Sequence, residues 1–277
     1  MYDLHTHTSR SDGQHTPEEL VLLAAQRNLQ GLGITDHDEI GGIERALAQA
    51  ARTGLEIIPG VELSTSHRGY DVHILGYFID YRDRGLLHFL HTLQEQRRRR
   101  ASRIVEKLNR LGVAMSFEAV LQEAGEGCIG RPHVANALVR EGYVTTFQDA
   151  FNHYLAEDKP AFVPKPELAP AAGIAIIHQA GGLAGLAHPG QNLTTEIVLE
   201  IIKIGVDAIE TIHPKHSSER QRFFQELAEK FGLLQTGGSD FHGGARGLEK
   251  LGHYSVSREQ VDRLRALVEE RRKIWQP

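Results

Sequence analysis

The N-terminal segment carries the clearest chemical signal in the chain, a His-x-His pair followed by an aspartate. His5 and His7 come directly after a short apolar stretch, and Asp12 lies in the next turn. Successive side chains of a strand point to opposite faces, so His5 and His7 share one face and can bind a single ion. This segment therefore predicts the first part of a metal centre, which Asp12 can fold over.

Further candidate ligands follow the ends of other apolar stretches. They are His37, Glu62, His188, Asp240 and His242. In a closed parallel barrel, side chains at the carboxyl ends of the strands converge on one pocket. Nitrogen and carboxylate ligands without thiolate suit Mn, Fe or Zn. The set exceeds what one ion needs and predicts two or three bridged divalent ions, a centre that suits hydrolysis of phosphate esters.

Short apolar strands alternate with amphipathic helices at both ends of the chain. Leu32 to Thr35 and Leu55 to Val61 read as buried strands, and Pro17 to Gln30 reads as a helix with Thr16 as its N-cap. Val72 to Ile79 reads as a further strand, and a last one is expected near His253 to Val256. This alternation predicts an α/β fold with a parallel arrangement of strands.

The middle of the chain loses this alternation. A long helix is expected from Leu86 to about Leu111, with Arg97 to Arg100 interpreted as a solvated helix face. Short helices separated by Gly- and Pro-rich turns follow. We therefore expect a barrel formed by residues 1–98 and 167–277, and a helical insertion over 99–166 that contributes to the substrate pocket.

The composition limits the class of protein. A net charge of -5 provides no global basic field for nucleic acid, so no DNA-binding domain is expected. The single cysteine, Cys128, excludes an internal disulfide and suits a reducing cytoplasm. No apolar run approaches the ~18 residues of a membrane span, and no signal peptide is evident. A cytoplasmic enzyme without a membrane partner or an evident obligate protein partner is the expectation.

Several motifs together resemble the PHP (polymerase and histidinol phosphatase) domain over nearly the whole chain. They are His5-Thr6-His7, Asp12-Gly13, Ile34 to Asp38, Pro59 to Glu62, Asp71 to Gly76, Ala187 to Pro189 and Gly238 to His242. The resemblance implies a distorted (β/α)7 barrel with two or three divalent ions. It also makes His73, inside a strand where a core histidine is the default, a metal ligand.

The resemblance implies how the ligands divide among the ions. One ion takes His5, His7, Glu62 and Asp240; a second takes Glu62, His73 and His188; a third takes Asp12, His37 and His242. In several PHP proteins a histidine stands at the position of Asp12. A carboxylate there suits a harder ion, so Mn is the expected metal, with Fe or Zn as alternatives.

The insertion is similar to that of a particular subfamily. The segments Gly130 to Ala135, Phe147 to Phe151 and Phe162 to Pro164 resemble the nucleoside 3',5'-bisphosphate phosphatases and RNase AM-like 5'-to-3' exoribonucleases. The resemblance implies hydrolysis of the 3'-phosphate of a small nucleotide, with trimming of short RNA as a further activity. Arg131 is then the expected clamp for a second phosphate, since guanidinium binds phosphate bidentately. Lys165 and His216 are candidates for the same role.

In the expected mechanism, a metal-bound hydroxide attacks phosphorus, so no serine or cysteine nucleophile is needed. The leaving oxygen is stabilised by the third ion or protonated by His213, and Asp36 orients a ligand histidine or caps its loop. Two alternatives remain open at this point. One is a histidinol-phosphatase-like or other monophosphatase, and the other is a non-catalytic PHP module that only binds metal.

Overall fold

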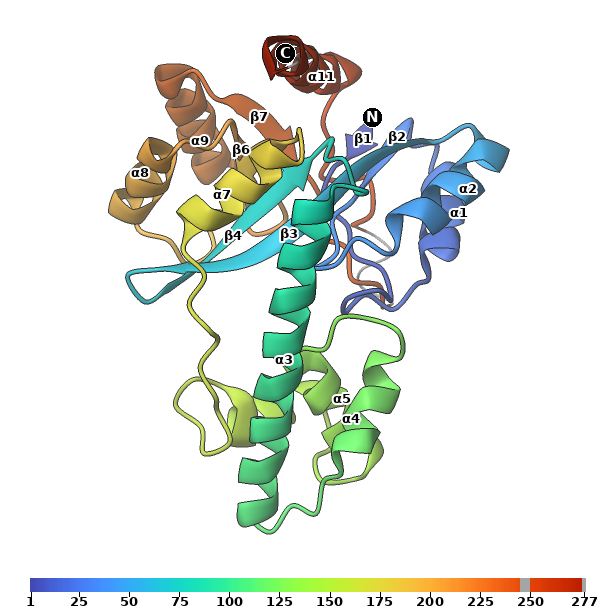
Figure 1. Ribbon diagram of the computed structural model, residues 1–277, viewed down its shortest axis with the longest axis vertical. Coiled ribbons are helices and arrows are strands. Elements are labelled where there is room, and N and C mark those ends of the chain that lie inside the picture. The colour runs from blue at the N-terminus through green and yellow to red at the C-terminus, as the bar shows by residue number, and fades with distance from the viewer. Residues whose placement is uncertain (245–249, 276–277) are drawn as a thin grey trace.

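Seven strands form one sheet whose spatial order is the order of the sequence. Figure 1 shows the computed structural model, which describes residues 1–244 and 250–275. The strands are β1 (Tyr2–Asp3), β2 (Gly31–Ile34), β3 (Glu56–His67), β4 (Tyr70–Tyr77), β5 (Leu183–Leu186), β6 (Ala208–Ile212) and β7 (Leu234–Gly237). Their near closure into a barrel confirms the predicted fold class.

The sheet closes because the ends of the chain meet. Leu4 N donates to Gly237 O at 3.2 Å, and His7 N donates to Phe241 O at 2.8 Å, so the segment after β1 runs beside the segment after β7. Val256 exchanges two backbone hydrogen bonds with Tyr2. The strand expected near His253 is thus reduced to one bridging residue.

One strand departs from the parallel arrangement. β4 pairs antiparallel with both β3 and β5, whereas the remaining neighbours are parallel. A turn at Arg68 and Gly69, both with positive φ, joins β3 to β4. A turn this short fits a hairpin, because a parallel connection needs a crossover of about a dozen residues or more. The prediction of a parallel arrangement is therefore wrong for β4.

Helices cover the outside of the barrel. They are α1 (Pro17–Gln26), α2 (Ile43–Thr53), α7 (Pro170–Gln179), α8 (Thr195–Ile204), α9 (Ser218–Phe231) and α11 (Arg258–Trp275). α1 begins with a capping box between Thr16 and Glu19. None of the described helices is long and apolar enough to cross a membrane.

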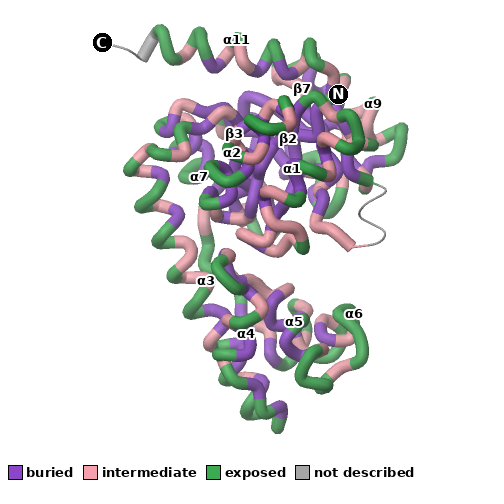
Figure 2. The backbone as a smooth tube through the Cα atoms, turned by 90° about the vertical axis from the view of Figure 1, so that its right-hand side faces the viewer, coloured by how far each residue is buried: buried purple, intermediate pink, exposed green. Residues whose placement is uncertain are grey.

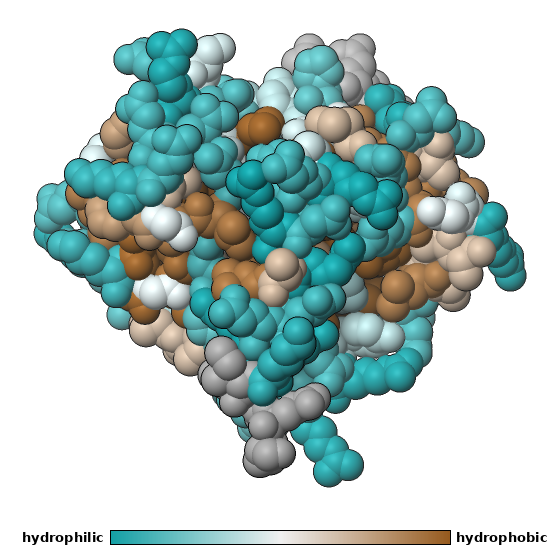
Figure 3. Space-filling view, turned by 90° about the horizontal axis from the view of Figure 1, so that it is seen from above, coloured by the Kyte–Doolittle hydropathy of each residue, from teal (hydrophilic) through white to brown (hydrophobic). Residues whose placement is uncertain are grey.

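The C-terminal helix α11 lies across the end of the barrel where β1 begins (Figures 1 and 2). Its buried residues Val261, Leu264 and Val268 recur at helical spacing and pack in one cluster with Tyr2 and Leu183. Seen from this end, the surface mixes hydrophilic and apolar residues, and hydrophilic side chains cover its centre (Figure 3). α11 therefore seals the structural end of the barrel and leaves the carboxyl ends of the parallel strands to the site.

A helical subdomain lies at the other end of the barrel (Figure 2). α3 (Arg84–Arg110) runs from the barrel into it, followed by α4 (Phe117–Ala124), α5 (Arg131–Arg140), α6 (Phe147–Ala150) and the π-helix η1 (Phe151–Leu155). These elements bury a hydrophobic cluster of their own, which includes Leu108, Val120 and Leu138. The expected domain boundary after residue 98 falls inside α3, so one continuous helix links the two parts.

The arginine run in α3 is not a uniform solvated face. Arg97 Nε donates to Asp38 Oδ2 at 2.7 Å, and Arg100 is only 9% exposed, with its Nε donating to Val163 O at 2.8 Å. Arg98 and Arg99 are exposed. Residues three apart share a helix face, so every third arginine turns inward. The prediction of a solvated face is therefore wrong for Arg97 and Arg100.

The backbone near barrel closure has no room for a side chain at Gly238. A Cβ there would lie 2.3 Å from the Cβ of His5 and 2.5 Å from its backbone N. We expect Gly238→Ala to lower the free energy of unfolding by about 1–3 kcal/mol, as overpacked cores do, and to displace His5. Urea denaturation measures the change.

Gly173→Ala in α7 is the matched control. Its Cβ would meet side-chain atoms of Thr65 and Leu63 at 3.2 Å and 3.4 Å, and the substitution gains helix propensity. We expect its unfolding free energy to stay within about 1 kcal/mol of the unsubstituted chain. Equal stability of the two variants would contradict the close approach at Gly238.

Candidate metal centre

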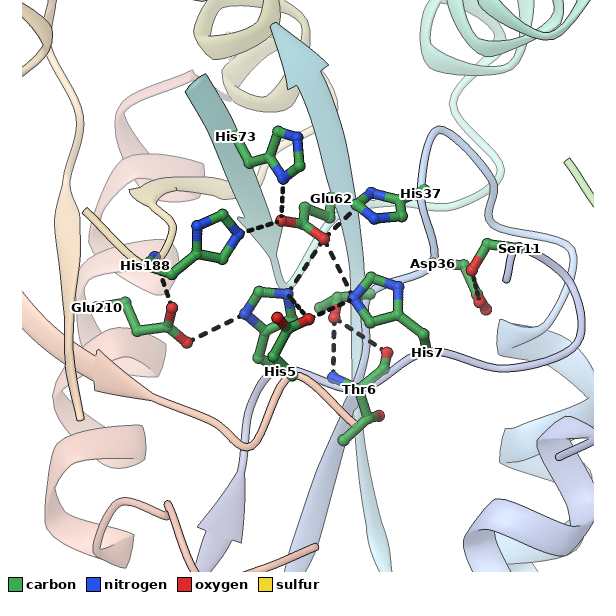
Figure 4. Close-up of polar contacts among 12 residues, drawn as sticks. His5, Thr6, His7, Ser11, Asp36, His37, Glu62, His73, His188 and Glu210 are labelled. Carbon is green, nitrogen blue, oxygen red and sulfur yellow. Dashed lines mark hydrogen bonds and ion pairs between the residues drawn. The ribbon is translucent and has the colours of Figure 1, made fainter. Parts of the chain in front are cut away.

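A buried carboxylate, Glu62 of β3, lies at the centre of the site (Figure 4). Its Oε2 is 3.1 Å from His5 Nε2, 3.1 Å from His7 Nε2 and 3.2 Å from His37 Nδ1. Its Oε1 is 2.8 Å from His73 Nδ1 and 3.0 Å from His188 Nε2. Side chains that follow β1, β2 and β5, or lie within β4, thus converge on one glutamate.

Two aspartates extend the cluster on the side of β7. Asp240 Oδ1 lies 3.3 Å from His7 Nε2 and 3.5 Å from His5 Nε2. Asp12 Oδ1 lies 3.2 Å from His242 Nε2, and the His242 ring stacks on the His7 ring at 4.1 Å. The structure therefore brings all of the predicted ligands together in one cluster.

The backbone is turned at several strand ends to present these side chains. Asp38, His188 and Asp240 have positive φ values of 51°, 27° and 50°. Residues other than glycine rarely adopt this region, and such strain gathers at functional sites. The turns after β2, β5 and β7 are thus specialised for orienting the cluster.

The cluster has the donor set and the unmet bonding needs of a metal centre. Four overlapping groups of described residues have ligand atoms within 4.8 Å of one another: His5, His7, Glu62 and Asp240; His7, Asp12, His37 and His242; His37, Glu62 and His73; and His5, Glu210 and His213. Among the described residues, several buried atoms of these groups lack a hydrogen-bond partner, including His7 Nδ1 and Nε2, His37 Nδ1 and Glu62 Oε2. Nitrogen and carboxylate atoms in this arrangement suit divalent ions.

The electrostatics of the cluster also indicate a metal centre. Burial opposes ionisation of Glu62, but the surrounding histidines hold the pKa of that carboxyl well below its usual range. Burial likewise opposes protonation of His73 and His242, yet Glu62 and Asp71 raise the pKa of His73 to about 9, and Asp12 raises that of His242 to about 10. Without an ion, protons therefore supply the positive charge that these carboxylates require.

Glu210 of β6 is a member of the site that the sequence reading missed. Its Oε1 is 3.1 Å from His5 Nδ1, and its Oε2 accepts the backbone N–H of His188 at 2.6 Å. A carboxylate on Nδ1 fixes the tautomer of His5 and leaves Nε2 facing Glu62 and the ion site. A charged residue in the middle of the buried strand Ala208–Ile212 was the available signal.

Asp36 lies behind the cluster and holds a loop. Its carboxylate accepts hydrogen bonds from Thr8 N at 2.7 Å, Thr8 Oγ1 at 2.7 Å and Ser11 Oγ at 2.6 Å. These bonds occupy the carboxylate and fix the loop that carries Asp12. The position suits the loop-capping role that was left open for Asp36, and not direct participation in catalysis.

His213 and His216 follow β6 but occupy different surroundings. His213 is fully buried and its Nε2 lies 3.5 Å from Asp240 Oδ2, at the edge of the cluster. His216 accepts the Gly190 N–H at Nε2, 3.0 Å away, and its Nδ1 is 3.1 Å from Thr211 O. Both ring nitrogens of His216 bind backbone groups, so neither is free for a phosphate. His213 faces the site, whereas His216 ties two loops together.

Arg131 and Lys165 lie where the subdomain meets the barrel. Lys165 forms an ion pair with Asp71, whose Oδ1 is 3.6 Å from His73 Nε2. Arg131, the first residue of α5, donates to Leu155 O at 3.4 Å. Lys165 therefore lies on the His73 side of the cluster, and the charge of Asp71 also acts on Arg131.

Removal of Glu210 should weaken metal binding. We expect Glu210→Ala to lower metal affinity by about 10–100-fold, because His5 loses the carboxylate that orients it, and Glu210→Gln to have a smaller effect. Competition with a chelator, followed by metal analysis, measures the affinity. Glu226→Gln on the exposed face of α9 is the control and should retain normal affinity. Unchanged affinity in Glu210→Ala would rule out this role.

Metal binding should also release protons. His73 and His242 must be neutral to bind an ion, and their raised pKa values mean that protons compete with the metal near neutral pH. Affinity should therefore rise from about pH 6.5 to about pH 8.5. Calorimetry in two buffers of different ionisation enthalpy should show a buffer-dependent heat at neutral pH. A heat independent of the buffer is the contrary result.

Comparison with known proteins identifies the family. Residues 3–157 match the family profile of the PHP domain. The chain is 35% identical to a 3',5'-nucleoside bisphosphate phosphatase of Chromobacterium violaceum, covering 91% of this chain and 90% of the relative. It is 36% identical to the 5'-3' exoribonuclease Rnm of Salmonella typhimurium, covering 87% and 85%. A solved structure from Bifidobacterium adolescentis, described as a candidate metal-dependent phosphoesterase, is similar with a TM-score of 0.86 and 31% identity, covering 95% and 94%. The chain therefore belongs to the PHP domain family and is a phosphoesterase, as its motifs predict.

Proposed function

We propose that this phosphoesterase hydrolyses the 3'-phosphate of nucleoside 3',5'-bisphosphates and, by the same chemistry, trims short 5'-phosphorylated RNA from its 5' end. The observation that carries the proposal is a group of cations beside the cluster around Glu62. One phosphate can react at the cluster while a second is held nearby. The names of two relatives, a bisphosphate phosphatase and a 5'-3' exoribonuclease, agree with a substrate of this kind.

The cations that support this reading are Arg100, Arg131 and Lys165, which we call the junction cluster. The guanidinium nitrogen Nη2 of Arg100 is buried and has no hydrogen-bond partner among the described residues. Burial, and then repulsion from Arg131 and Arg97, lowers the pKa of Arg100 to about 10. Lys165 has Asp71 as its partner, but Arg100 and Arg131 form no ion pair with a described residue. Bidentate guanidinium groups with uncompensated charge suit a phosphate.

The cluster around Glu62 would hold two or three divalent ions. His5, His7, Glu62 and Asp240 would bind one, Glu62 with His73 and His188 a second, and Asp12, His37 and His242 a third. The two aspartates and the carboxylate bridge favour Mn, with Fe or Zn as alternatives. Bound ions would supply the nucleophile at neutral pH and neutralise the phosphate oxygens.

We infer that His213 binds the leaving oxygen as a hydrogen-bond donor. Its Nδ1 accepts the N–H of Lys215 at 3.2 Å, so the proton of the neutral ring is on Nε2. Nε2 faces Asp240 at the edge of the cluster. Addition of water breaks the bond between phosphorus and the 3'-oxygen: the hydroxyl group of the water goes to phosphorus and its proton goes to the 3'-oxygen, to which His213 Nε2–H donates a hydrogen bond. A cytoplasmic location is part of the proposal.

A phosphate-release assay with Mn²⁺ tests the proposal. It compares nucleoside 3',5'-bisphosphates, 3'-monophosphates and histidinol phosphate. Trimming of 5'-phosphorylated RNA frees no inorganic phosphate, so it is followed in parallel by the nucleoside monophosphates that are released. We expect the bisphosphate to be preferred, and Arg131→Ala to raise its KM about 10–100-fold while changing that of the monophosphate much less, since a charge-assisted bidentate contact is lost. The exposed neighbour Arg99→Ala is the control and should leave both KM values unchanged.

Two results would contradict the proposal. An equal rise in the KM values of the bisphosphate and the monophosphate in Arg131→Ala would rule out a site that binds two phosphates. Preference for histidinol phosphate over every nucleotide would instead favour the monophosphatase alternative.

A further inference from the structure

A cleft opens beside the metal centre, between the barrel and the helical subdomain. It encloses about 780 Å³ and is lined on the barrel side by the candidate ligands Asp12, Asp240 and His242. Asp71, His73 and His188 line a separate cavity, and Lys165 lies next to Asp71. Space for a ligand therefore extends from the centre in two directions.

The far wall of this cleft belongs to the helical subdomain and presents an exposed aromatic ring. Phe147, the first residue of α6, lines the cleft and is 44% exposed. Its position is fixed by a capping box, in which Asp149 N donates to Thr146 Oγ1 at 3.1 Å and Thr146 N donates to Asp149 at 2.9 Å. An exposed ring held in place at the edge of a cleft suits stacking of a planar ligand.

The charges on the walls favour an anionic ligand. Lys215 and Lys250 line the cleft on the barrel side, are exposed, and form no ion pair with a described residue. Three acidic residues also line the cleft: Glu123 is paired with Arg140 at 2.6 Å, and Asp12 and Asp240 are candidate metal ligands that contact His242 and His7. Among the described lining residues, the two lysines are therefore the charges left for a ligand, in a chain of net charge -5. An aromatic platform beside a basic groove is the combination that binds single-stranded nucleic acid.

We infer that this cleft is a subsite for the nucleotides downstream of the scissile bond, in which Phe147 stacks a base and Lys215 and Lys250 contact backbone phosphates. The inference rests on the proposed function and extends it from the first nucleotide to the rest of a short RNA. Hydrolysis adds water across the bond between phosphorus and the 3'-oxygen of the first nucleotide. That nucleotide leaves with a 3'-hydroxyl, and the phosphate stays on the 5'-oxygen of the next nucleotide.

The two substrate types share this reaction and differ in what lies beyond the phosphorus. A bisphosphate carries nothing there, so it has no group for the cleft to bind. An RNA carries its remaining nucleotides. Phe147 and the lysines should therefore decide how well RNA is used relative to a bisphosphate, and the ratio of the two kcat/KM values isolates their contribution.

The test measures kcat/KM for a 5'-phosphorylated trinucleotide and for a nucleoside 3',5'-bisphosphate in the full chain with Mn²⁺. Phe147→Ala should lower the ratio of trinucleotide to bisphosphate about tenfold, and Phe147→Trp should restore it. The double variant Lys215→Ala, Lys250→Ala should also lower the ratio and should weaken the salt dependence of trinucleotide hydrolysis. Phe231→Ala, at a 39% exposed aromatic residue on α9 outside the cleft, is the matched control.

The outcomes separate this inference from the function on which it rests. An unchanged ratio in both variants overturns the downstream subsite while bisphosphate hydrolysis stands. An equal fall in both kcat/KM values for Phe147→Ala also overturns it, because Phe147 would then contact the first nucleotide. Absence of bisphosphate hydrolysis in the unsubstituted chain refutes the proposed function itself. A fall in the ratio that Phe147→Trp reverses supports the inference.

Discussion

The site depends on a carboxylate, Glu62, buried among histidines at the end of a nearly closed barrel. A buried charge is costly unless it is paired and hydrogen-bonded. Glu62 Oε1 meets this requirement through His73 and His188 at 2.8 Å and 3.0 Å. Oε2 lies 3.1–3.2 Å from nitrogens of three further histidines but has no hydrogen-bond partner among the described residues. Each strand must therefore end at the correct level along the barrel axis, and the pairing of the segments after β1 and β7 fixes that level. A divalent ion can replace the protons that balance this charge. The buried negative charge that is costly in the metal-free site therefore favours metal binding.

The remainder of the structure supports this arrangement from both ends. α11 closes the end of the barrel where the strands begin, and its apolar stripe leaves no ionisable cluster there comparable to the one around Glu62 in the described residues. At the other end, Arg97 crosses from α3 to bind Asp38, which directly follows His37. Cys128 N also donates to Arg10 O at 2.7 Å, within the loop that Asp36 holds. The subdomain is thus bonded to two of the loops that carry candidate ligands.

The fold class and most of the candidate ligands could be predicted because they depend on local signals, whereas His73, inside β4, became a candidate only through the family resemblance. Polar residues directly after apolar strands are visible in the chain, and their convergence follows from barrel geometry. Glu210 lies inside a strand and has no such flanking signal. The inward faces of Arg97 and Arg100 depend on where α3 lies against the barrel, and the bonds of His216 depend on two loops that meet only in space. The antiparallel β4 required recognition of the turn at Arg68 and Gly69.

The division between barrel and subdomain would explain how one site serves the two proposed substrates. In the proposed mechanism, the barrel supplies the ligand cluster and His213, which would act on any phosphate ester that reaches Glu62. Arg131 and Phe147 both come from the subdomain, and both contact Phe151. The ring centroid of Phe151 lies 5.2 Å from that of Phe147 and 5.8 Å from the guanidinium carbon of Arg131. In the proposed function, recognition of the 5'-phosphate and of downstream bases would therefore reside in one small unit of the subdomain. Changes within that unit can shift preference between nucleotide and RNA without altering the reacting groups.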